Sequence, residues 1–243
     1  MTKSALPETA MVLAAGLGKR MRPLTDHRPK PLVEVAGKPL IDYTLDRFAA
    51  AGVRRAVVNV HYFADMMEAH LAERTAPEIT ISDERGLLLE TGGGLKKAAP
   101  LLGDAPIFCS NTDAILLDDG AGEACANLAA QWREDDMDAL LLLVSPEQAS
   151  GYEGKGDFDM GDDARIAFRS GESASYIYTG LQILSPRLLE GAPEGPFSTR
   201  LLWDKALAEG RLYGAVHDGF WMHVGDPEGL KLAEARLAAR KGA

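Results

Sequence analysis

Cysteines and long apolar runs are scarce in this chain. It has two cysteines among 243 residues, Cys109 and Cys125, and neither stands in a C-x-x-C pattern. The sequence therefore offers no disulfide framework and no zinc site, and we expect two core thiols. Apolar runs such as Ala139–Val144 are far below the roughly 18 residues of a membrane span, so we expect no membrane-spanning helix. The apolar stretch Ala10–Ala15 ends at Gly16 and is too short for a signal-peptide core, which favours a cytoplasmic protein.

Basic charge is also in deficit, because 26 Lys and Arg residues face 36 Asp and Glu residues, a net charge of −10. Such a net charge repels nucleic acid and argues against nonspecific polyanion binding. One segment reverses the sign: residues 19–38 hold six basic side chains and two acidic ones. A compact anionic ligand would explain this patch. With 46% hydrophobic residues the composition is that of an ordinary globular protein, which excludes disorder.

Over the first 110 residues short apolar runs alternate with helical patterns, which indicates a doubly wound α/β fold with a mostly parallel sheet. The predicted strands are Ala10–Ala15, Arg55–Val60, Glu78–Ser82, Ala105–Ser110 and Asp138–Val144, and the predicted helices are Pro39–Ala51, Ala64–Arg74 and Gly92–Ala99. The doubly wound core is predicted to end near Val144.

Beyond this core, the glycine-rich and charged stretch 150–171 indicates antiparallel ribbons or loops in a small substrate-side lobe. Strands are predicted at Tyr176–Leu184 and Arg211–Val216, and helices at Phe197–Glu209 and Pro227–Arg240. We expect a single domain over residues 1–243, with the core at about 8–145 and the remaining part at 146–243.

The richest segment follows the first predicted strand. Gly16 and Gly18 allow the backbone to approach a phosphate chain closely, with amides turned toward its oxygens. The dinucleotide fingerprint fails because Met21 stands where its third glycine belongs, which disfavours an NAD-dependent oxidoreductase, and the Walker A pattern fails as well.

Two cations in this segment, Arg20 and Lys30, could reach the same anion. Pro29 and Pro31 flank Lys30, and we expect them to hold it in an extended backbone that restricts where its ammonium points.

This segment resembles the signature of the sugar-1-phosphate nucleotidylyltransferases, which is a strand, then G-x-G-x-R-M/L, then P-K-P-L and G-x-P-L. The matching residues are Gly16, Gly18, Arg20, Met21, Pro29–Leu32, Gly37, Pro39 and Leu40. Within the family, Leu89–Gly94 and Gly154–Phe158 look closest to the N-acetylmuramate-1-phosphate uridylyltransferases of cell-wall recycling. Members similar to mannose-1-phosphate guanylyltransferase are near neighbours, and the residues do not separate the two.

The resemblance implies a Rossmann-like nucleotidyltransferase core with a small sugar-binding antiparallel lobe, an NTP and a sugar 1-phosphate as substrates, and Mg²⁺ or Mn²⁺ as cofactor. It implies no nucleic-acid or membrane partner, and a monomer or small homo-oligomer. The implied catalytic residues are Arg20 and Lys30, and the implied nucleotide-binding residues are Leu13, Ala14, Ala15, Gly16, Gly18, Lys19, Glu90, Thr91, Gly92 and Asn111. The implied sugar-binding residues are Gly154, Asp157, Tyr178, Thr179 and Gly180, and the implied metal ligands are Asp113 and His223.

One position departs from the family pattern. The family typically shows Trp-x-Asp-Val/Ile-Gly near its C-terminus, whereas this chain has His223 in place of the acid. Histidine is a poor ligand for Mg²⁺ and a better one for Mn²⁺. His223 could contact the metal or phosphate, Asp226 or Asp218 could replace it, or Asp113 could act with ligand oxygens alone. A histidine that only packs, and a noncatalytic nucleotide-sugar-binding homologue, stay open.

The aromatic residues have spacings typical of core packing rather than base stacking. This prediction covers Trp132, Trp203, Tyr43 and Phe48.

Overall fold

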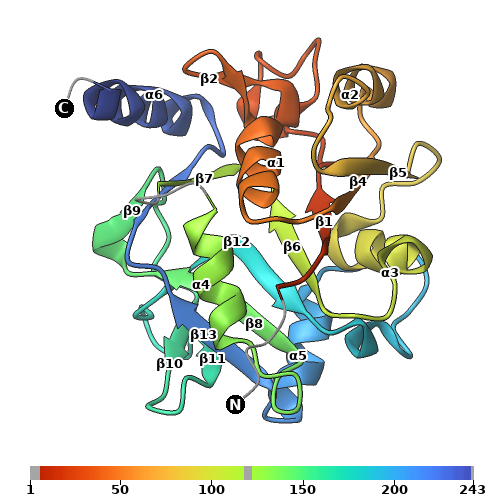
Figure 1. Cartoon of the computed structure of the whole chain (residues 1–243). Coiled ribbons are helices and arrows are strands. Elements are labelled where there is room, and N and C mark those ends of the chain that lie inside the picture. The colour runs from red at the N-terminus through yellow and green to blue at the C-terminus, as the bar shows by residue number, and fades with distance from the viewer. Residues whose placement is uncertain (1–5, 118–121, 242–243) are drawn as a thin grey trace.

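The structure is a computed structural model and describes residues 6–117 and 122–241. Its centre is a seven-stranded sheet with the order β13-β8-β12-β6-β1-β4-β5 (Figure 1). The strands are β1 (Thr9–Leu13), β4 (Arg55–Val60), β5 (Glu78–Asp83), β6 (Ile107–Asn111), β8 (Ala139–Val144), β12 (Ile177–Leu184) and β13 (Leu212–Val216). Strand β12 runs antiparallel to both of its neighbours, and all other neighbouring strands are parallel.

Helices cover both faces of this sheet, which confirms the doubly wound α/β prediction. Alternation along β1 sends Ala10 and Val12 into one core cluster and Met11 into the other. The first cluster is completed by α1 (Leu40–Ala50), α2 (Ala64–Leu71) and α4 (Glu123–Gln131), and the second by α3 (Glu90–Leu102) and α5 (Arg200–Ala208). Phe48 of α1 is fully buried, and burial of one such side chain stabilises the fold by about 2 kcal/mol.

Three small sheets surround the main one. They are the antiparallel pairs β10 (Phe158–Met160) with β11 (Ile166–Phe168) and β2 (Glu34–Val35) with β3 (Lys38–Pro39), and the sheet β7 (Ala114–Leu117)-β14 (Phe220–His223)-β9 (Ala149–Ser150). The β10–β11 pair confirms the antiparallel ribbon expected within 150–171. Helix α6 (Pro227–Lys241) lies at the edge of the molecule in Figure 1 and packs on β14 through a third core cluster.

Several predictions need correction. Strands β12 and β13 belong to the main sheet, so the sheet does not end at Val144. Helix α4 and strands β7 and β14 were not expected as separate elements. Lys30 begins a one-turn 3-10 helix, Lys30–Leu32, and is not extended. Only Pro29 before it is extended, and Pro31 fits within a first turn because its missing N–H would have no partner there.

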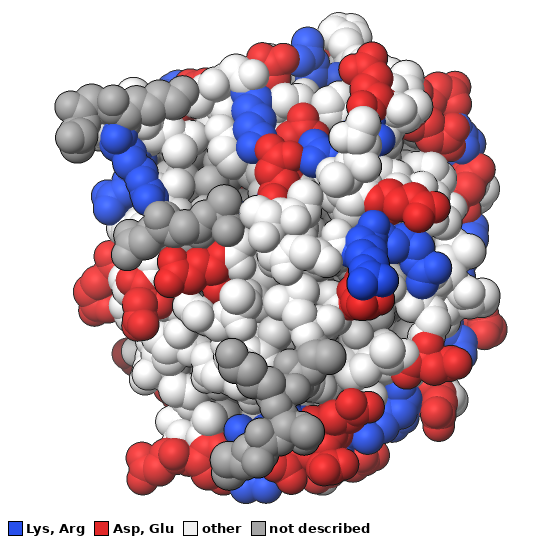
Figure 2. Space-filling view, viewed as in Figure 1, with Lys and Arg blue, Asp and Glu red and all other residues white. Residues whose placement is uncertain are grey.

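Other expectations agree with the structure. Cys109 and Cys125 are both free and buried. Among the described residues no helix has the length and apolar character that crossing a bilayer requires. On the face shown in Figure 2, acidic and basic side chains are interspersed and form no continuous basic area. Trp132 and Phe48 are buried core residues, and the half-buried Trp203 and Tyr43 pack against core clusters, which agrees with the predicted core packing.

Candidate active site

A buried polar network fixes the start of the glycine loop, which follows β1. The Ala14 amide donates to Asn59 Oδ1 at 2.6 Å, and Asn59 Nδ2 donates to Glu84 Oε1 at 2.8 Å. Glu84 is fully buried, and its second oxygen accepts the Leu89 amide at 3.2 Å. One carboxylate therefore connects the loop with the segment before α3. Sequence analysis missed both residues, although Asn59 is a visible signal because it interrupts the apolar strand β4.

The loop turns at Gly18 and folds back over Lys30. Gly18 has φ +60°, and a Cβ atom there would lie 2.9 Å from Lys30 Cβ and 3.0 Å from Thr25 Cγ2. The Thr25 hydroxyl donates to the Gly18 carbonyl oxygen at 2.9 Å. Only glycine combines this left-handed backbone with so close an approach. Within the described part of the chain the amides of Gly16 and Leu17 donate to no acceptor, so they are available to an anion.

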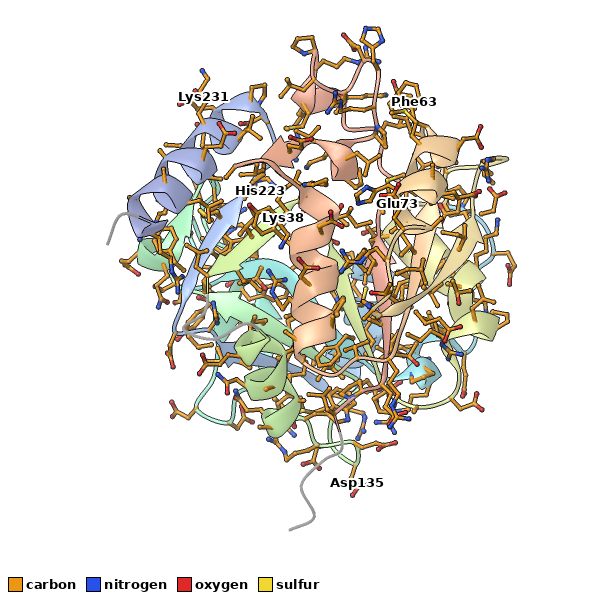
Figure 3. The ribbon with its side chains drawn as sticks, turned by 45° about the horizontal axis from the view of Figure 1, so that its top comes forward. Lys38, Phe63, Glu73, Asp135, His223 and Lys231 are labelled. Atoms are coloured by element: carbon orange, nitrogen blue, oxygen red, sulfur yellow. The ribbon has the colours of Figure 1, made fainter. Side chains whose placement is uncertain are left out.

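Lys30 and His223 meet at one carboxylate. Lys30 Nζ donates to Asp113 Oδ2 at 3.0 Å, and His223 Nε2 lies 3.6 Å from the same oxygen. Burial alone would raise the pKa of the Asp113 carboxyl, but the neighbouring His223 ring and the Lys30 ammonium outweigh it and hold that pKa well below its usual range. Asp113 follows the carboxyl end of β6, and His223, labelled in Figure 3, ends β14. Segments distant in sequence thus converge on an ionised carboxylate.

Lys30 and Asp113 line one pocket at the carboxyl ends of β1 and β6, with a volume of about 630 Å³, whereas His223 is not part of its lining and reaches only Asp113. In an open α/β sheet this edge is where ligands bind. The predicted residues that line the pocket are Leu13, Ala14, Ala15, Gly16, Gly18, Lys19, Arg20, Lys30, Glu90, Thr91, Asn111 and Asp113. The lining residues that sequence analysis missed include Asn59, Ser198 and Gly225. The Lys19 and Arg20 side chains are exposed at its wall.

Gly92 is the predicted nucleotide-binding residue that lies behind this wall. Its amide donates to the Phe197 carbonyl oxygen at 2.8 Å, and a Cβ there would lie 2.4 Å from the Phe197 ring. A Cβ on Gly93 or Gly94 would overlap Gly195 or the Asn59–Glu84 pair. The glycine run therefore serves close packing of α3. At the start of α3, Glu90 has φ +60°, a strained conformation for a residue with a side chain.

The predicted sugar-binding residues lie apart from this lining. Asp157 and Tyr178 line a second hollow, and Asp157 Oδ2 accepts the Tyr178 amide at 3.0 Å. Thr179 faces the other way: its buried hydroxyl donates to the Leu142 carbonyl oxygen at 2.9 Å. Gly180 packs against the Asn111 side chain, and Gly154 packs against the Tyr152 ring. Sugar binding by these residues stays a prediction, and the Thr179 hydroxyl does not support it.

The replacements considered for His223 as a metal ligand do not reach the site. Asp226 Oδ1 accepts the Glu228 and Gly229 amides at 3.1 and 2.9 Å and so caps the start of α6. Asp218 is exposed and lines a different hollow beside Phe220. His223 Nδ1 lies 3.2 Å from the Gly151 carbonyl oxygen, which turns Nε2 toward Asp113.

The donor set at Asp113 fits a divalent cation that shares its shell with a phosphate. Within residues 6–117 and 122–241, no group of three His, Cys, Asp or Glu side chains could hold a metal alone. Mg²⁺ commonly takes one or two carboxylates and completes its shell with water and substrate phosphates, whereas an imidazole nitrogen is a better ligand for transition metals. Asp113 and His223 could therefore supply part of a shell that a bound phosphate would complete.

An amide-rich loop opposite a cation and a strand-end carboxylate is the arrangement expected of a site for the phosphate groups of a nucleotide. The family model described as nucleotidyl transferase matches residues 9–168, and the chain belongs to this family of enzymes.

Individual relatives are similar along the whole chain. The chain is 51% identical over 240 residues to the N-acetylmuramate alpha-1-phosphate uridylyltransferase of Caulobacter vibrioides, which covers 97% of this chain and 99% of that protein. It is 34% identical to the protein of the same name from Neisseria meningitidis serogroup B, over 96% of this chain and 99% of that protein. The structure of the inositol-1-phosphate CTP transferase from T. maritima has a TM-score of 0.79 at 19% identity, covers 99% of both chains, and so shows a shared fold.

Proposed function

We propose that this chain joins UTP to N-acetylmuramate 1-phosphate, giving the UDP-sugar and pyrophosphate. The observation that carries the proposal is the convergence of the glycine loop, Lys30 and Asp113 on one pocket of about 630 Å³. Sequence identity of 51% to a relative of that name over 97% of the chain supports the choice of base and sugar.

The reaction needs no nucleophile from the protein. An oxygen of the sugar phosphate attacks the α-phosphorus of UTP, a new P–O bond forms, and the bond to the β-phosphate oxygen breaks to release pyrophosphate. Catalysis then rests on positioning and on neutralising charge. The free amides of Gly16 and Leu17 receive the triphosphate, and Arg20 stabilises the pyrophosphate side.

Lys30 has the most specific role in this scheme. Its ammonium is nearly buried, with 12% of the side chain exposed, and pairs with Asp113 when no substrate is bound. We assign it to the α-phosphate or the sugar phosphate, where its charge offsets the charge that develops during attack.

A divalent cation would be held by Asp113 Oδ2 and His223 Nε2, together with phosphate oxygens. When bound, it neutralises phosphate charge and orients the α-phosphate. Lys30 and His223 already lie against Asp113 and keep that carboxylate ionised, ready to accept a cation. The histidine favours Mn²⁺ over Mg²⁺ in this chain more than an aspartate would.

The remaining features of the proposal follow from the reaction. The predicted base-side residues Glu90, Thr91 and Asn111 border the same pocket. The chain works in the cytoplasm, where UTP is made, as a monomer or small homo-oligomer without nucleic-acid or membrane partners. Its product returns a recovered sugar to peptidoglycan synthesis.

The test is pyrophosphate release from UTP, GTP, CTP or dTTP, each combined with the 1-phosphates of N-acetylmuramate, mannose, glucose and N-acetylglucosamine, with Mg²⁺ and with Mn²⁺. We expect UTP with N-acetylmuramate 1-phosphate to react fastest. GTP with mannose 1-phosphate as the best pair would replace the proposed substrates. Nucleotide binding without turnover in any combination would make the chain a noncatalytic homologue, the alternative that His223 favours.

Variants separate the role of Lys30 from that of charge in general. Lys30→Met should lower kcat by roughly two to three orders of magnitude, as loss of an electrostatic stabiliser does. Arg28→Met removes the same charge from an exposed side chain two residues away that does not line the pocket, and should keep nearly full activity. Near-wild-type turnover by folded Lys30→Met would refute the assignment.

A further inference from the structure

A second hollow, with a volume of about 340 Å³, lies beside the β10–β11 pair. Its wall contains two arginines, Arg169 and Arg200, together with the aromatic residues Phe158, Phe168, Tyr178 and Trp203. Gly156 and Asp157 complete the lining. None of these residues lines the first pocket. Apolar walls with a few charged groups are typical of a site for a small molecule.

Aromatic and backbone contacts hold the two guanidinium groups in place. The Arg200 guanidinium lies over the Phe168 ring, 3.3 Å from its centroid, and Nε donates to Asp204 Oδ1 at 3.2 Å. Arg169 Nη1 donates to the Glu172 carbonyl oxygen at 3.2 Å, and Arg169 pairs with no carboxylate among the described residues. Each guanidinium therefore keeps donors for a ligand, since the group carries five N–H bonds.

The carboxylate in this wall is already satisfied. Asp157 Oδ1 accepts the Tyr152 hydroxyl at 3.1 Å, and Oδ2 accepts the Tyr178 amide at 3.0 Å. Burial, together with the charge of Asp157, raises the pKa of Tyr152 to about 12, so this hydroxyl remains a donor. The lining itself therefore holds two cations and one anion whose oxygens already accept hydrogen bonds, while Asp204, the partner of Arg200, lies outside the lining.

Two features connect this hollow with the first pocket. Ser198 lines the first pocket, and Arg200, two residues later, lines the second. Strand β12 pairs with β6 at Leu181–Ser110, and Gly180 packs against the side chain of Asn111, which lines the first pocket, so Tyr178 lies two residues along β12 from that contact. One ligand with its phosphate at Asp113 could thus extend past Tyr178 into the second hollow.

We propose that Arg169 and Arg200 recognise a carboxylate on the sugar and so select N-acetylmuramate 1-phosphate over N-acetylglucosamine 1-phosphate. The two sugars differ by a lactyl ether that ends in a carboxylate. A guanidinium matches a carboxylate with two parallel hydrogen bonds, and Phe168 fixes the plane of one of them. This inference rests on the proposed function and names the residues that choose its sugar.

Calorimetry with UDP-N-acetylmuramate and UDP-N-acetylglucosamine tests the proposal without need of turnover. The measured quantity is the ratio of the two Kd values. Wild-type protein should prefer UDP-N-acetylmuramate by about 10- to 100-fold, the range expected for charge-assisted hydrogen bonds to one carboxylate. In the Arg169→Gln/Arg200→Gln double variant the two Kd values should differ by no more than about threefold.

Lys155→Gln is the matched control, because Lys155 is an exposed cation next to the lining residue Gly156 but does not itself line the hollow. It should leave the ratio as in wild type. UTP binding in every variant reports that the first pocket is folded.

Each other outcome overturns the proposal. Equal affinity of the wild type for both sugar nucleotides removes its basis, and so does an unchanged ratio in the double variant. A parallel loss of affinity for both ligands assigns the arginines to the shared phosphates or to folding. Failure of the proposed function is distinct, since it appears as absent pyrophosphate release from the wild type.

Discussion

Replacing Gly18 by alanine tests whether the glycine loop positions Lys30. An alanine at φ +60° costs about 1 kcal/mol in backbone strain alone. Its Cβ would also approach Lys30 Cβ to 2.9 Å and Thr25 Cγ2 to 3.0 Å. Neither neighbour is the free end of a flexible side chain: Lys30 Cβ is attached to backbone between two prolines, and Thr25 is buried and hydrogen-bonded to Gly18.

Relief of these contacts must therefore move Lys30 by a few tenths of an ångström. We expect Gly18→Ala to lose about 2 to 3 kcal/mol of unfolding free energy, the sum of the strain and a modest overpacking cost. Since misplacement of a catalytic group by about 1 Å costs up to about 100-fold, we expect kcat/KM to fall by at least about tenfold. Urea unfolding measures the first quantity and pyrophosphate release the second, with UTP binding as a check that does not require turnover.

Gly37→Ala is the matched control. Gly37 has φ +79° in the turn between β2 and β3, and a Cβ there would meet nothing within 4 Å. It should lose only the strain of about 1 kcal/mol and keep its kcat/KM. If Gly18→Ala matched Gly37→Ala in both stability and activity, the loop would not position Lys30, and the reasoning would be refuted.

Three further changes probe the structure behind the site. Asp138 is 2% exposed and accepts hydrogen bonds from Arg187 and, at 2.9 Å, from Arg211 Nε. Asp138→Ala should therefore lower the free energy of unfolding, measured in urea, by about 3 kcal/mol. The control Asp104→Ala, at an exposed position, should lower it by less than about 0.5 kcal/mol. Asn59→Leu removes the acceptor of the Ala14 amide and a donor to buried Glu84. We expect the free energy of unfolding to fall by about 3 kcal/mol and UTP binding, measured by calorimetry, to weaken. Unchanged UTP affinity would show that the loop does not need this support. Burial raises the pKa of the Cys109 thiol from 9.0 to about 12, so stability present below pH 9 should decline as pH rises toward 12, and Cys109→Ala should flatten that decline in urea titrations.

The sequence pattern predicted the parallel half of the sheet because its central strands are buried on both faces. Strands β1, β4, β6 and β8 are near-continuous apolar runs. Polar side chains on strands covered on both faces would be buried without hydrogen-bond partners, which is why such strands are apolar. Strand β14 is only four residues long and one of a small sheet, so its existence depends on pairing with β7, which no local pattern encodes. The continuation of the main sheet through β12 and β13 depends in the same way on tertiary pairing rather than on propensity.

The residues of the candidate site likewise differ in whether a local segment or the tertiary fold brings them to the site. Residues of the glycine loop could be predicted because a single continuous segment supplies them, and backbone geometry forces its amides to one side. Ser198 and Arg200, which the sequence analysis missed, come from segments whose place is set only by the tertiary fold.

Adjacent residues in a strand also face opposite sides of the sheet, so not every residue of a motif on a strand can contact the same ligand. Tyr178 lines the second hollow, whereas Thr179 beside it donates to Leu142 and accepts the Trp221 indole N–H at 2.9 Å. Arg200 is distant from Tyr178 in sequence, yet both line one hollow. Strand alternation alone would have separated Tyr178 from Thr179, but only the fold could bring an arginine to the same wall. A sugar specificity carried by Arg169 and Arg200 would therefore be invisible to motif comparison, because neither residue belongs to the segments that define the family resemblance.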